Sequence, residues 1–366
     1  MPICFKDSWL TIGKHKVSRL SLFSYIMDWA LYLAILIGFM IYGSLVPPVY
    51  HEFLLEDISL MNSYKPEGMT LVPMPVLILI AVVFPMLQII LCSVLQTNTL
   101  HSTRKVWDIF IGMTSLCGAM SIQLMMTCIL KNICGLPRPD LISRCDPDYS
   151  IDFVSGRLAT VDVCQSPDLV LVSEGFRSFP SGHSSTVFCG MILASLNISA
   201  KLQIFDSRGV SLKFLLVIIP IMIACFVSCS RISDNRHFLR DVIGGLAIGA
   251  GSAIFFYLQY FPWITKLENC GRAYPPRRIG VSVWCNNIGG FWKINDKLDG
   301  SYQERCLNDV SIIELIKKVD CEFSIDSTEF IQTDRNIEYF NRLSEKFKHR
   351  IFNISNKQRA TNTNYV

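Results

Sequence analysis

The feature that most constrains this chain is a series of six apolar stretches, each long enough to cross a lipid bilayer. A helix needs about 20 mostly apolar residues to span the hydrocarbon core. The stretches cover residues 22–46, 72–95, 106–130, 183–200, 212–230 and 239–261. Hydrophobic residues make up 51% of the chain and charged residues only 17%, which is too apolar for an ordinary soluble surface. The sequence therefore predicts an all-α integral membrane protein, built as a six-helix transmembrane bundle.

The fourth stretch differs from the others because it is short and rich in small polar residues. It reads "HSSTVFCGMILASLNISA". Small side chains allow helices to approach closely in a membrane. We therefore expect this helix to lie among the others rather than against lipid.

Basic residues around the stretches predict an orientation, because loops rich in Lys and Arg stay in the cytosol. The opposite side includes the 47–70 loop, in which Lys65 is the only Lys or Arg. Both termini should therefore be cytosolic, and the loops at 131–182 and 231–238 should face the lumen or the cell exterior. The residues assigned to the cytosolic side are Lys6, Lys14, Lys16, Arg19, Arg104, Lys105, Lys201, Arg208, Lys213, Lys266, Arg272, Arg277 and Arg278.

Three regions follow from this pattern: a cytosolic N-terminal segment at 1–21, a six-span domain at 22–263 and a polar cytosolic tail at 264–366. The N-terminus has basic residues but no compact apolar core followed by a cleavage site, so the first span should serve as the targeting signal. Within the tail, "DRNIEYFNRLSEKFKHRIF" carries apolar residues at helical spacing. This segment is either an amphipathic helix on a membrane or a partner, or a solvated helix in a partly ordered tail.

The cysteines do not form a zinc-binding pattern, although there are fourteen of them. Those inside apolar stretches are interpreted as small buried hydrophobic residues. Cys145 and Cys164 share a predicted lumenal loop, where a disulfide would be compatible with an oxidising compartment. Cys134 is a competing partner, so the pairing stays open at this point.

Three short polar segments carry the candidate chemistry. They are "KNICGLPRPD" at the end of the third span, "FPSGHSS" at the start of the fourth, and "SRISDNRHFLRD" between the fifth and sixth. The predicted topology brings all three to one face of the membrane. Each alone has an ordinary interpretation, since Lys and Arg at helix ends often extend toward headgroups and Ser and Gly often begin helices.

The combined pattern K-x6-RP, PSGH and SR-x5-H-x3-D resembles the type 2 phosphatidic acid phosphatase, or lipid phosphate phosphatase, superfamily. Every fixed position of the pattern is matched. The longer forms "KNICGLPRPDLISRCDPD" and "FRSFPSGHSST" are most similar to the fungal and animal phosphatases that act on phosphatidate and diacylglycerol pyrophosphate. The resemblance covers residues 20 to 265 and leaves the tail unexplained.

The residue types suit phosphoryl transfer, in which negative charge spreads over the phosphate oxygens. Lys131, Arg138 and Arg231 supply three cations, and the arginines can bind pairs of oxygens. Ser181 and Gly182 lie at a helix start, where unpaired N–H groups attract anions. We expect this phosphate-binding set to work without a metal or another cofactor.

Two histidines divide the remaining steps. His237 and Asp241 are four residues apart, so on a helix they would share one face, and the carboxylate could hold one imidazole nitrogen while the other attacks phosphorus. His183 can protonate the leaving oxygen and then activate water. The resemblance implies the same roles: His237 as nucleophile, Asp241 as its partner and His183 as acid.

Other polar residues have weaker interpretations. Asp146 and Asp148 are expected in a solvated loop rather than a cation site, and Asp234, Arg236 and Arg240 either tune the site or pair at its rim. Asp28, together with prolines near the second span, raises a transporter alternative, but Asp28 is close enough to the cytosolic end to reach the interface. The sequons at Asn197 and Asn353 fall on the cytosolic side and should stay unglycosylated.

The expected function is hydrolysis of phosphatidate, diacylglycerol pyrophosphate or a related lipid phosphate, with the bilayer itself as a partner. The alternatives are an isoprenoid diphosphate or sphingoid-base phosphate phosphatase, a phosphatase for soluble sugar phosphates, and a catalytically silent lipid-binding scaffold or transporter. A net charge of +4 gives no reason to expect nucleic acid binding. The location is expected in the vacuole, Golgi, ER or plasma membrane, and a homo-oligomer is compatible with the sequence.

Overall fold

The structure is a computed structural model that describes residues 9–12, 15–95, 102–148, 156–206, 209–265 and 271–274. Almost all of the predicted tail, with its amphipathic segment, lies outside these residues. The domain boundaries at 21 and 263 therefore stay predictions.

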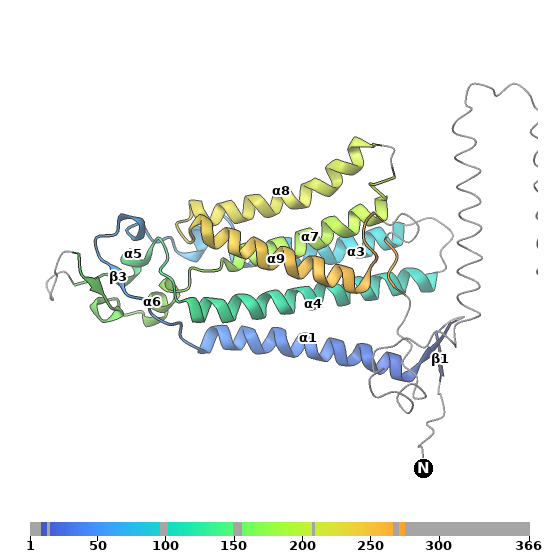
Figure 1. The fold of residues 1–366 in the computed structure, drawn as a ribbon, viewed down its shortest axis with the longest axis horizontal. Helices are drawn as coiled ribbons and strands as arrows, with labels where there is room; N and C mark the ends of the chain where they lie inside the picture. The colour runs from blue at the N-terminus through green and yellow to red at the C-terminus, as the bar shows by residue number, and fades with distance from the viewer. Residues whose placement is uncertain are drawn as a thin grey trace, which may run out of the picture. The chain divides into compact units, whose positions relative to one another are not determined.

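Six helical spans are present among the described residues, as the sequence predicts (Figure 1). Each agrees with its predicted stretch to within a few residues. The six are Leu22–Leu45, Met74–Leu95, Lys105–Cys134, Gly182–Leu202, Ser211–Ser233 and Leu239–Tyr260. The helices that contain them are α1 (Arg19–Leu45), α2 (Met74–Ile78) with α3 (Phe84–Leu95), α4 (Ser102–Cys134), α7 (Gly182–Leu202), α8 (Ser211–Ser233) and α9 (Leu239–Tyr260).

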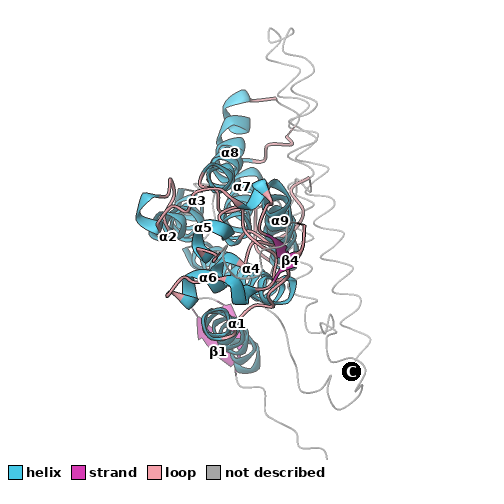
Figure 2. Cartoon of the chain, turned by 90° about the vertical axis from the view of Figure 1, so that its left-hand side faces the viewer, coloured by secondary structure: helices cyan, strands magenta, loops and turns pink. Residues whose placement is uncertain are grey.

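Helix α7 is the interior helix of the bundle, which confirms the prediction made from its small residues. In its apolar window 72% of the residues are buried, compared with 6% in that of α1. Gly249 of α9 faces the backbone of α7 so closely that an added Cβ would lie 2.3 Å from the carbonyl oxygen of Ser185. The end-on view shows α7 between α3, α8 and α9 (Figure 2). Small residues therefore set the distance between these helices.

The second span contains one turn of π-helix, η3 (Leu79–Val83), between α2 and α3. Pro85 follows this turn and has no N–H to donate to the carbonyl of Ala81, four residues earlier. That carbonyl lies against α7 where Gly190 has no side chain, because a Cβ there would be 1.9 Å from the Ala81 oxygen. The prolines of this span thus shape a helix-packing contact. Pro73 and Pro75 lie at the N-terminus of α2, where a missing N–H costs no helical hydrogen bond.

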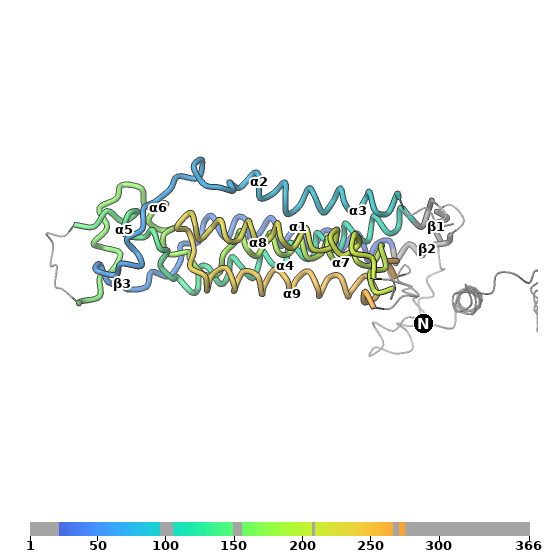
Figure 3. The backbone as a smooth tube through the Cα atoms, turned by 90° about the horizontal axis from the view of Figure 1, so that it is seen from above, coloured from blue at the N-terminus to red at the C-terminus, as the bar shows by residue number. Residues whose placement is uncertain are grey.

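A small cap lies at one end of the bundle, beside the ends of α1, α4, α8 and α9 (Figures 1 and 3). It has its own apolar cluster, which includes Phe53, Leu141 and Phe176. The Cys145–Cys164 disulfide joins two of its segments, and Cys134 is free. The open question about cysteine pairing is thereby decided. The cap consists of β3 (Phe53–Leu54), η1 (Ile58–Leu60), α5 (Leu141–Cys145), β4 (Leu158–Ala159), η4 (Val161–Val163) and α6 (Leu169–Gly175), and β3 pairs antiparallel with β4.

The opposite end of the bundle carries several of the basic residues that the orientation argument used. Lys201 forms a buried ion pair with Asp108 at 3.0 Å. The backbone N–H of Ala273 donates to the other oxygen of Asp108, and the Trp107 indole donates to the carbonyl of Tyr274. The described part of the chain after the sixth span therefore packs against the bundle. Near α1, β1 (Trp9–Ile12) and β2 (His15–Ser18) form an antiparallel pair.

Candidate active site

The three polar segments meet at the capped end of the bundle. Lys131 lies in the last turn of α4, His183 in the first turn of α7 and Arg231 in the last turn of α8. Asp241 lies in the first turn of α9, whereas His237 lies in the turn before this helix, so the two do not share a helix face as the sequence predicted. Segments separated by up to about a hundred residues in sequence thus share one site, as the topology predicts.

Arg231 links two of the three segments. Its Nη1 lies 3.3 Å from Nε2 of His183, and its Nη2 lies 2.9 Å from Oδ2 of Asp234. A guanidinium group can only donate, so Nε2 of His183 acts as the acceptor in this arrangement. Arg231 is nearly fully buried, with 2% of its surface exposed. Its position is therefore fixed from both sides.

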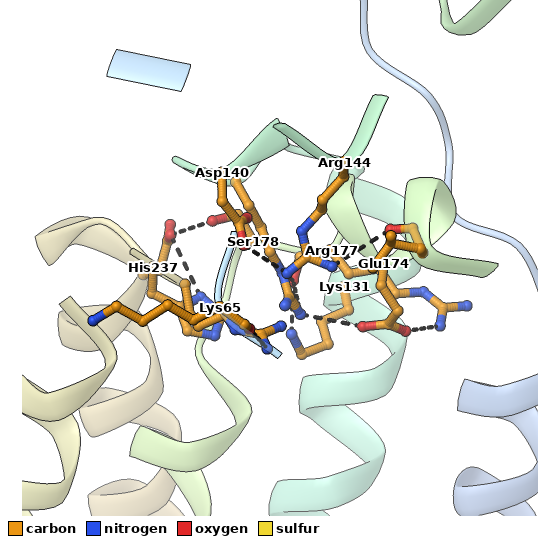
Figure 4. Close-up of polar contacts among 12 residues, drawn as sticks. Lys65, Lys131, Asp140, Arg144, Glu174, Arg177, Ser178 and His237 are labelled. Carbon is orange, nitrogen blue, oxygen red and sulfur yellow. Dashed lines mark hydrogen bonds and ion pairs between the residues drawn. The ribbon is translucent and has the colours of Figure 1, made fainter. Parts of the chain in front are cut away.

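Lys131 and Arg138 converge on one backbone oxygen. Nζ of Lys131 donates to the carbonyl of Arg177 at 2.8 Å, and Nε of Arg138 approaches the same oxygen at 3.4 Å. Glu174 binds Nη2 of Arg138 at 3.2 Å and Nη1 of Arg177 at 2.5 Å (Figure 4). Burial lowers the pKa of Arg138 to about 10, which still leaves this side chain charged at neutral pH. The site therefore keeps a dense positive charge, which Glu174 neutralises in part.

The start of α7 provides the backbone part of the site. The Ser181 hydroxyl is the N-cap and accepts a hydrogen bond from the N–H of Ser184, while the Ser181 N–H donates to the carbonyl of Asp241. Among the described residues, the amides of Gly182 and His183 have no hydrogen bond to the protein. These amides are the first-turn donors that a helix N-terminus can offer to an anion.

Gly182 has room for a Cβ as far as the protein is concerned. An added Cβ would lie 3.6 Å from Cε of Lys131 and 4.0 Å from Thr127, which are ordinary contact distances. Its backbone also needs no left-handed conformation. Neither folding nor packing therefore requires glycine here. A Cβ at this position would lie next to the Lys131 side chain.

His237 is buried beside a carboxylate that several other groups hold. Its Nδ1 lies 3.7 Å from Oδ2 of Asp241, which is too long for a hydrogen bond. The same oxygen accepts hydrogen bonds from the Ser178 hydroxyl at 2.5 Å and from the Phe238 N–H at 2.9 Å. Burial lowers the pKa of His237 from its ordinary value, and the charges of Lys131 and Arg138 act in the same direction. The imidazole is therefore neutral at neutral pH.

The structure thus brings together all eight residues that the sequence analysis selected. It also adds Glu174, Arg177 and Ser178, which lie next to the second segment but outside the fixed pattern. Arg177 and Ser178 lie within the longer segment "FRSFPSGHSST" that carries the family resemblance, which was the signal that could have drawn attention to them. Asp234 pairs with Arg231 inside the site rather than at its rim, whereas Arg240 is more exposed, with 59% of its side chain accessible.

Other predicted features lie away from the site. Asp148 accepts a hydrogen bond from Gln165 in the cap. Among the residues described, no group of three or more His, Cys, Asp or Glu side chains is placed to hold a metal ion. Asn197 of the first sequon is buried in α7 and accepts a hydrogen bond from Gln88, so its side chain is inaccessible to modification in the folded protein.

The fold and the site together define a multi-pass integral membrane protein with a cluster of basic residues and histidines at one end of its helix bundle. Residues 112–264 match the PAP2 superfamily. "Lipid phosphate phosphatase 2" of Arabidopsis thaliana is 34% identical over 64% of this chain and 77% of the relative. "Probable diacylglycerol pyrophosphate phosphatase 1" of Schizosaccharomyces pombe is 32% identical over 69% of this chain and 85% of the relative. The chain belongs to the PAP2 superfamily.

A third relative, "Diacylglycerol pyrophosphate phosphatase 1" of Saccharomyces cerevisiae, is 28% identical over 59% of this chain and 72% of the relative. No solved structure matches the chain. The family membership confirms the resemblance noted in the sequence, and the chain is an enzyme of the phosphatase class.

Proposed function

We propose that this enzyme hydrolyses membrane lipid phosphates, namely phosphatidate, diacylglycerol pyrophosphate or both. The observation that carries the proposal is the gathering of the three motif segments at the end of a bundle of membrane-spanning helices. A lipid can present its phosphate at that level while its acyl chains stay in hydrocarbon. The printed names of the relatives point to the same substrate class.

The first step of the proposed mechanism is phosphate binding. Lys131, Arg138 and Arg231 supply the positive charge, and the free amides of Gly182 and His183 supply backbone donors. The first two side chains now share the carbonyl of Arg177 as an acceptor, and a phosphate would replace it. Charge-assisted hydrogen bonds to phosphate are stronger than those to a neutral carbonyl. This exchange of acceptors favours the charged ligand.

The second step is attack by His237. Its buried imidazole is neutral, so a ring nitrogen has a lone pair available. Asp241 lies on the Nδ1 side, which leaves Nε2 to bond to phosphorus. As the N–P bond forms, the bond from phosphorus to the leaving oxygen breaks, and the positive charge on the imidazole is stabilised by Asp241. The intermediate is a phosphohistidine.

His183 carries the protons in both halves of the reaction. In the resting site its Nε2 accepts from Arg231. A bound phosphate oxygen would accept the Nη1 donor of Arg231 while Nη2 stays on Asp234. Nε2 of His183 is then free to take a proton from the monoprotonated phosphate group and to give it to the leaving oxygen. His183 then removes a proton from water as the water attacks phosphorus, and the products are inorganic phosphate and free His237.

We also propose that the reaction needs no metal ion, because the protein's own cations and amides can offset the charge of the transition state. The active site should face the lumen or the cell exterior, with both termini in the cytosol, following the distribution of basic residues.

The deciding experiment measures phosphate release from a panel of lipids by the purified full-length enzyme, with and without EDTA. The panel contains phosphatidate, diacylglycerol pyrophosphate, an isoprenoid diphosphate, a sphingoid-base phosphate and a water-soluble sugar phosphate. We expect release from the glycerolipids that EDTA does not abolish. Activity confined to another class would overturn the substrate assignment, and loss in EDTA would overturn the metal-free step.

His237→Ala tests the nucleophile, and His51→Ala is its matched control because His51 lies exposed in the loop after the first span. His237→Ala should lose phosphatase activity. It should also carry no radiolabelled phosphate when it is mixed with labelled lipid and quenched rapidly without acid, which would hydrolyse a phosphohistidine. The control should retain both. Activity that persists in His237→Ala would remove this residue from the role.

A further inference from the structure

Asp234 is a fully buried carboxylate that the mechanism has not yet used. It lies three residues after Arg231, just past the end of α8, and 0% of its surface is exposed. Its Oδ2 accepts hydrogen bonds from Nη2 of Arg231 at 2.9 Å and from the Leu71 N–H at 3.0 Å. Burying a charge is costly unless it is paired and hydrogen-bonded, and both conditions are met here.

The partner of Asp234 on the other side is the 63–71 segment, which we call the strap. Besides Leu71, the strap contributes Lys65, whose Nζ lies 3.5 Å from Oδ1 of Asp234 and donates to the carbonyl of Ser233 at 3.0 Å. The residues that follow Asp234 bind the strap in return: Asn235 donates to the carbonyl of Ser63, and Arg236 donates to the carbonyl of Lys65. The strap is therefore bound to residues 233–236, which include the end of α8 and the start of the turn that leads to α9.

This arrangement determines where the Arg231 guanidinium can point. One terminal nitrogen is held by Asp234, and the other lies against His183. A long arginine side chain has many rotamers, and holding it in one of them removes an entropy cost from substrate binding. Positioned donors are also the main source of transition-state stabilisation in phosphoryl transfer.

We propose that Asp234 is a positioning residue, which fixes the phosphate-binding geometry of Arg231 and couples the strap to it. The inference rests on the proposed function in that Arg231 is taken to contact the transferred phosphate. Asp234 itself touches no substrate and acts through Arg231.

The test is a double-mutant cycle with Asp234→Asn and Arg231→Lys in the full-length enzyme. Asparagine keeps the shape of the side chain and loses its charge. We expect Asp234→Asn alone to lower kcat on the preferred lipid about 10- to 100-fold, as expected for a misplaced charge-assisted donor. In the Arg231→Lys background the same change should lower kcat less than threefold, because the guanidinium that it positions is gone. Equal effects in both backgrounds would overturn the proposal.

Asp206→Asn is the matched control, because Asp206 pairs with Lys213 near the opposite end of the bundle. It should leave kcat within twofold of the wild type. Lys65→Met tests the strap through a side chain that is 39% exposed, and we expect a two- to fivefold loss of kcat without loss of folded protein. A kcat of Lys65→Met equal to that of the wild type would contradict the proposed coupling between the strap and Arg231.

Binding of orthovanadate, a phosphate analogue, gives a readout that does not depend on the lipid substrate. Vanadate should raise the unfolding temperature of the wild type and of Asp206→Asn, and raise that of Asp234→Asn much less. A purely structural role would lower the starting temperature of Asp234→Asn and leave the vanadate-induced increase unchanged. If the wild type binds vanadate but hydrolyses no lipid, the proposed function fails while the role of Asp234 is still decided by these shifts.

Discussion

At Gly182 the effect of a substitution on folding can be separated from its effect on phosphate binding. A Cβ added at Gly182 would meet its neighbours at ordinary contact distances, and the nearest atom would be Cε of Lys131 at 3.6 Å. We predict that Gly182→Ala folds with a stability within about 1 kcal/mol of the wild type, since alanine is the better helix former. Its kcat/KM should fall at least about tenfold, because the methyl group occupies the space beside the phosphate donors.

The control for this prediction is Gly251→Ala in α9, where an added Cβ would meet nothing within 4 Å. Both variants should unfold at similar temperatures, but only Gly182→Ala should lose activity. Full activity in Gly182→Ala would mean that phosphate does not approach the start of α7.

The protonation of His237 gives a second prediction at this scale. Burial lowers the pKa of His237 below 6.5, so the neutral imidazole that attacks phosphorus persists to a lower pH. After correction for ionisation of the lipid phosphate, kcat/KM should stay constant as the pH is lowered through 6.5. It should decline only at a lower pH, where His237 becomes protonated. A decline centred at or above 6.5 would contradict the assignment.

Stability must be measured alongside this pH profile. An unfolded chain binds a proton on this histidine below pH 6.5, whereas the folded protein resists protonation there. The free energy of unfolding therefore decreases as the pH falls from 6.5 toward the pKa of His237 in the folded protein. Unfolding temperatures at each pH will separate loss of fold from loss of activity.

At the scale of whole helices, glycine positions in α9 determine how closely it packs on α7. An added Cβ at Gly249 would lie 2.3 Å from a backbone oxygen and 2.9 Å from the N of Cys189, neither of which can move without moving the helix. We predict that Gly249→Ala destabilises the bundle by about 1–3 kcal/mol, the usual cost of overpacking. Denaturation in mild detergent checks this, and Gly251→Ala on the same helix should be neutral.

The helix ends, rather than the helix centres, carry the chemistry. Lys131, Arg231 and His183 each lie within the first or last turn of a span, where the backbone has unpaired groups and the side chain can leave hydrocarbon. Helical packing then determines which ends meet. If Gly249→Ala shifts α9 against α7, it should also lower kcat, because Ser181 binds Asp241 across this interface.

At the scale of the whole molecule, the cap lies at one end of the bundle, next to the site (Figure 1). The ion pairs of Lys201 and Lys213 lie toward the opposite end. Disulfides are typical of lumenal or extracellular loops, so the Cys145–Cys164 bond and the basic residues favour the same orientation. Leu158 is an exposed residue of the cap, and Leu158→Asn would create the sequon N-A-T. We predict that this variant becomes glycosylated in a eukaryotic host.

Glycosylation is measured as a shift in electrophoretic mobility that a glycosidase reverses. The wild-type chain is the control and should show no such shift, because Asn197 is buried and Asn353 is predicted to lie on the cytosolic side. A Leu158→Asn variant that folds, is active and carries no glycan would place the cap in the cytosol and overturn the proposed orientation.

The six spans and the interior place of α7 could be predicted from the sequence, because apolar length and small-residue content are local properties. The proposed site residues could be selected because the motif that they match has fixed spacing. The pairing of Cys145 with Cys164 was open because distance along the chain does not give distance in space. The folded structure was needed to show that Arg231 lies against His183, that Ser178 binds Asp241 and that Asp234 binds the Leu71 N–H. These contacts depend on how helix ends from separate spans are packed, and no local pattern in the sequence encodes that packing.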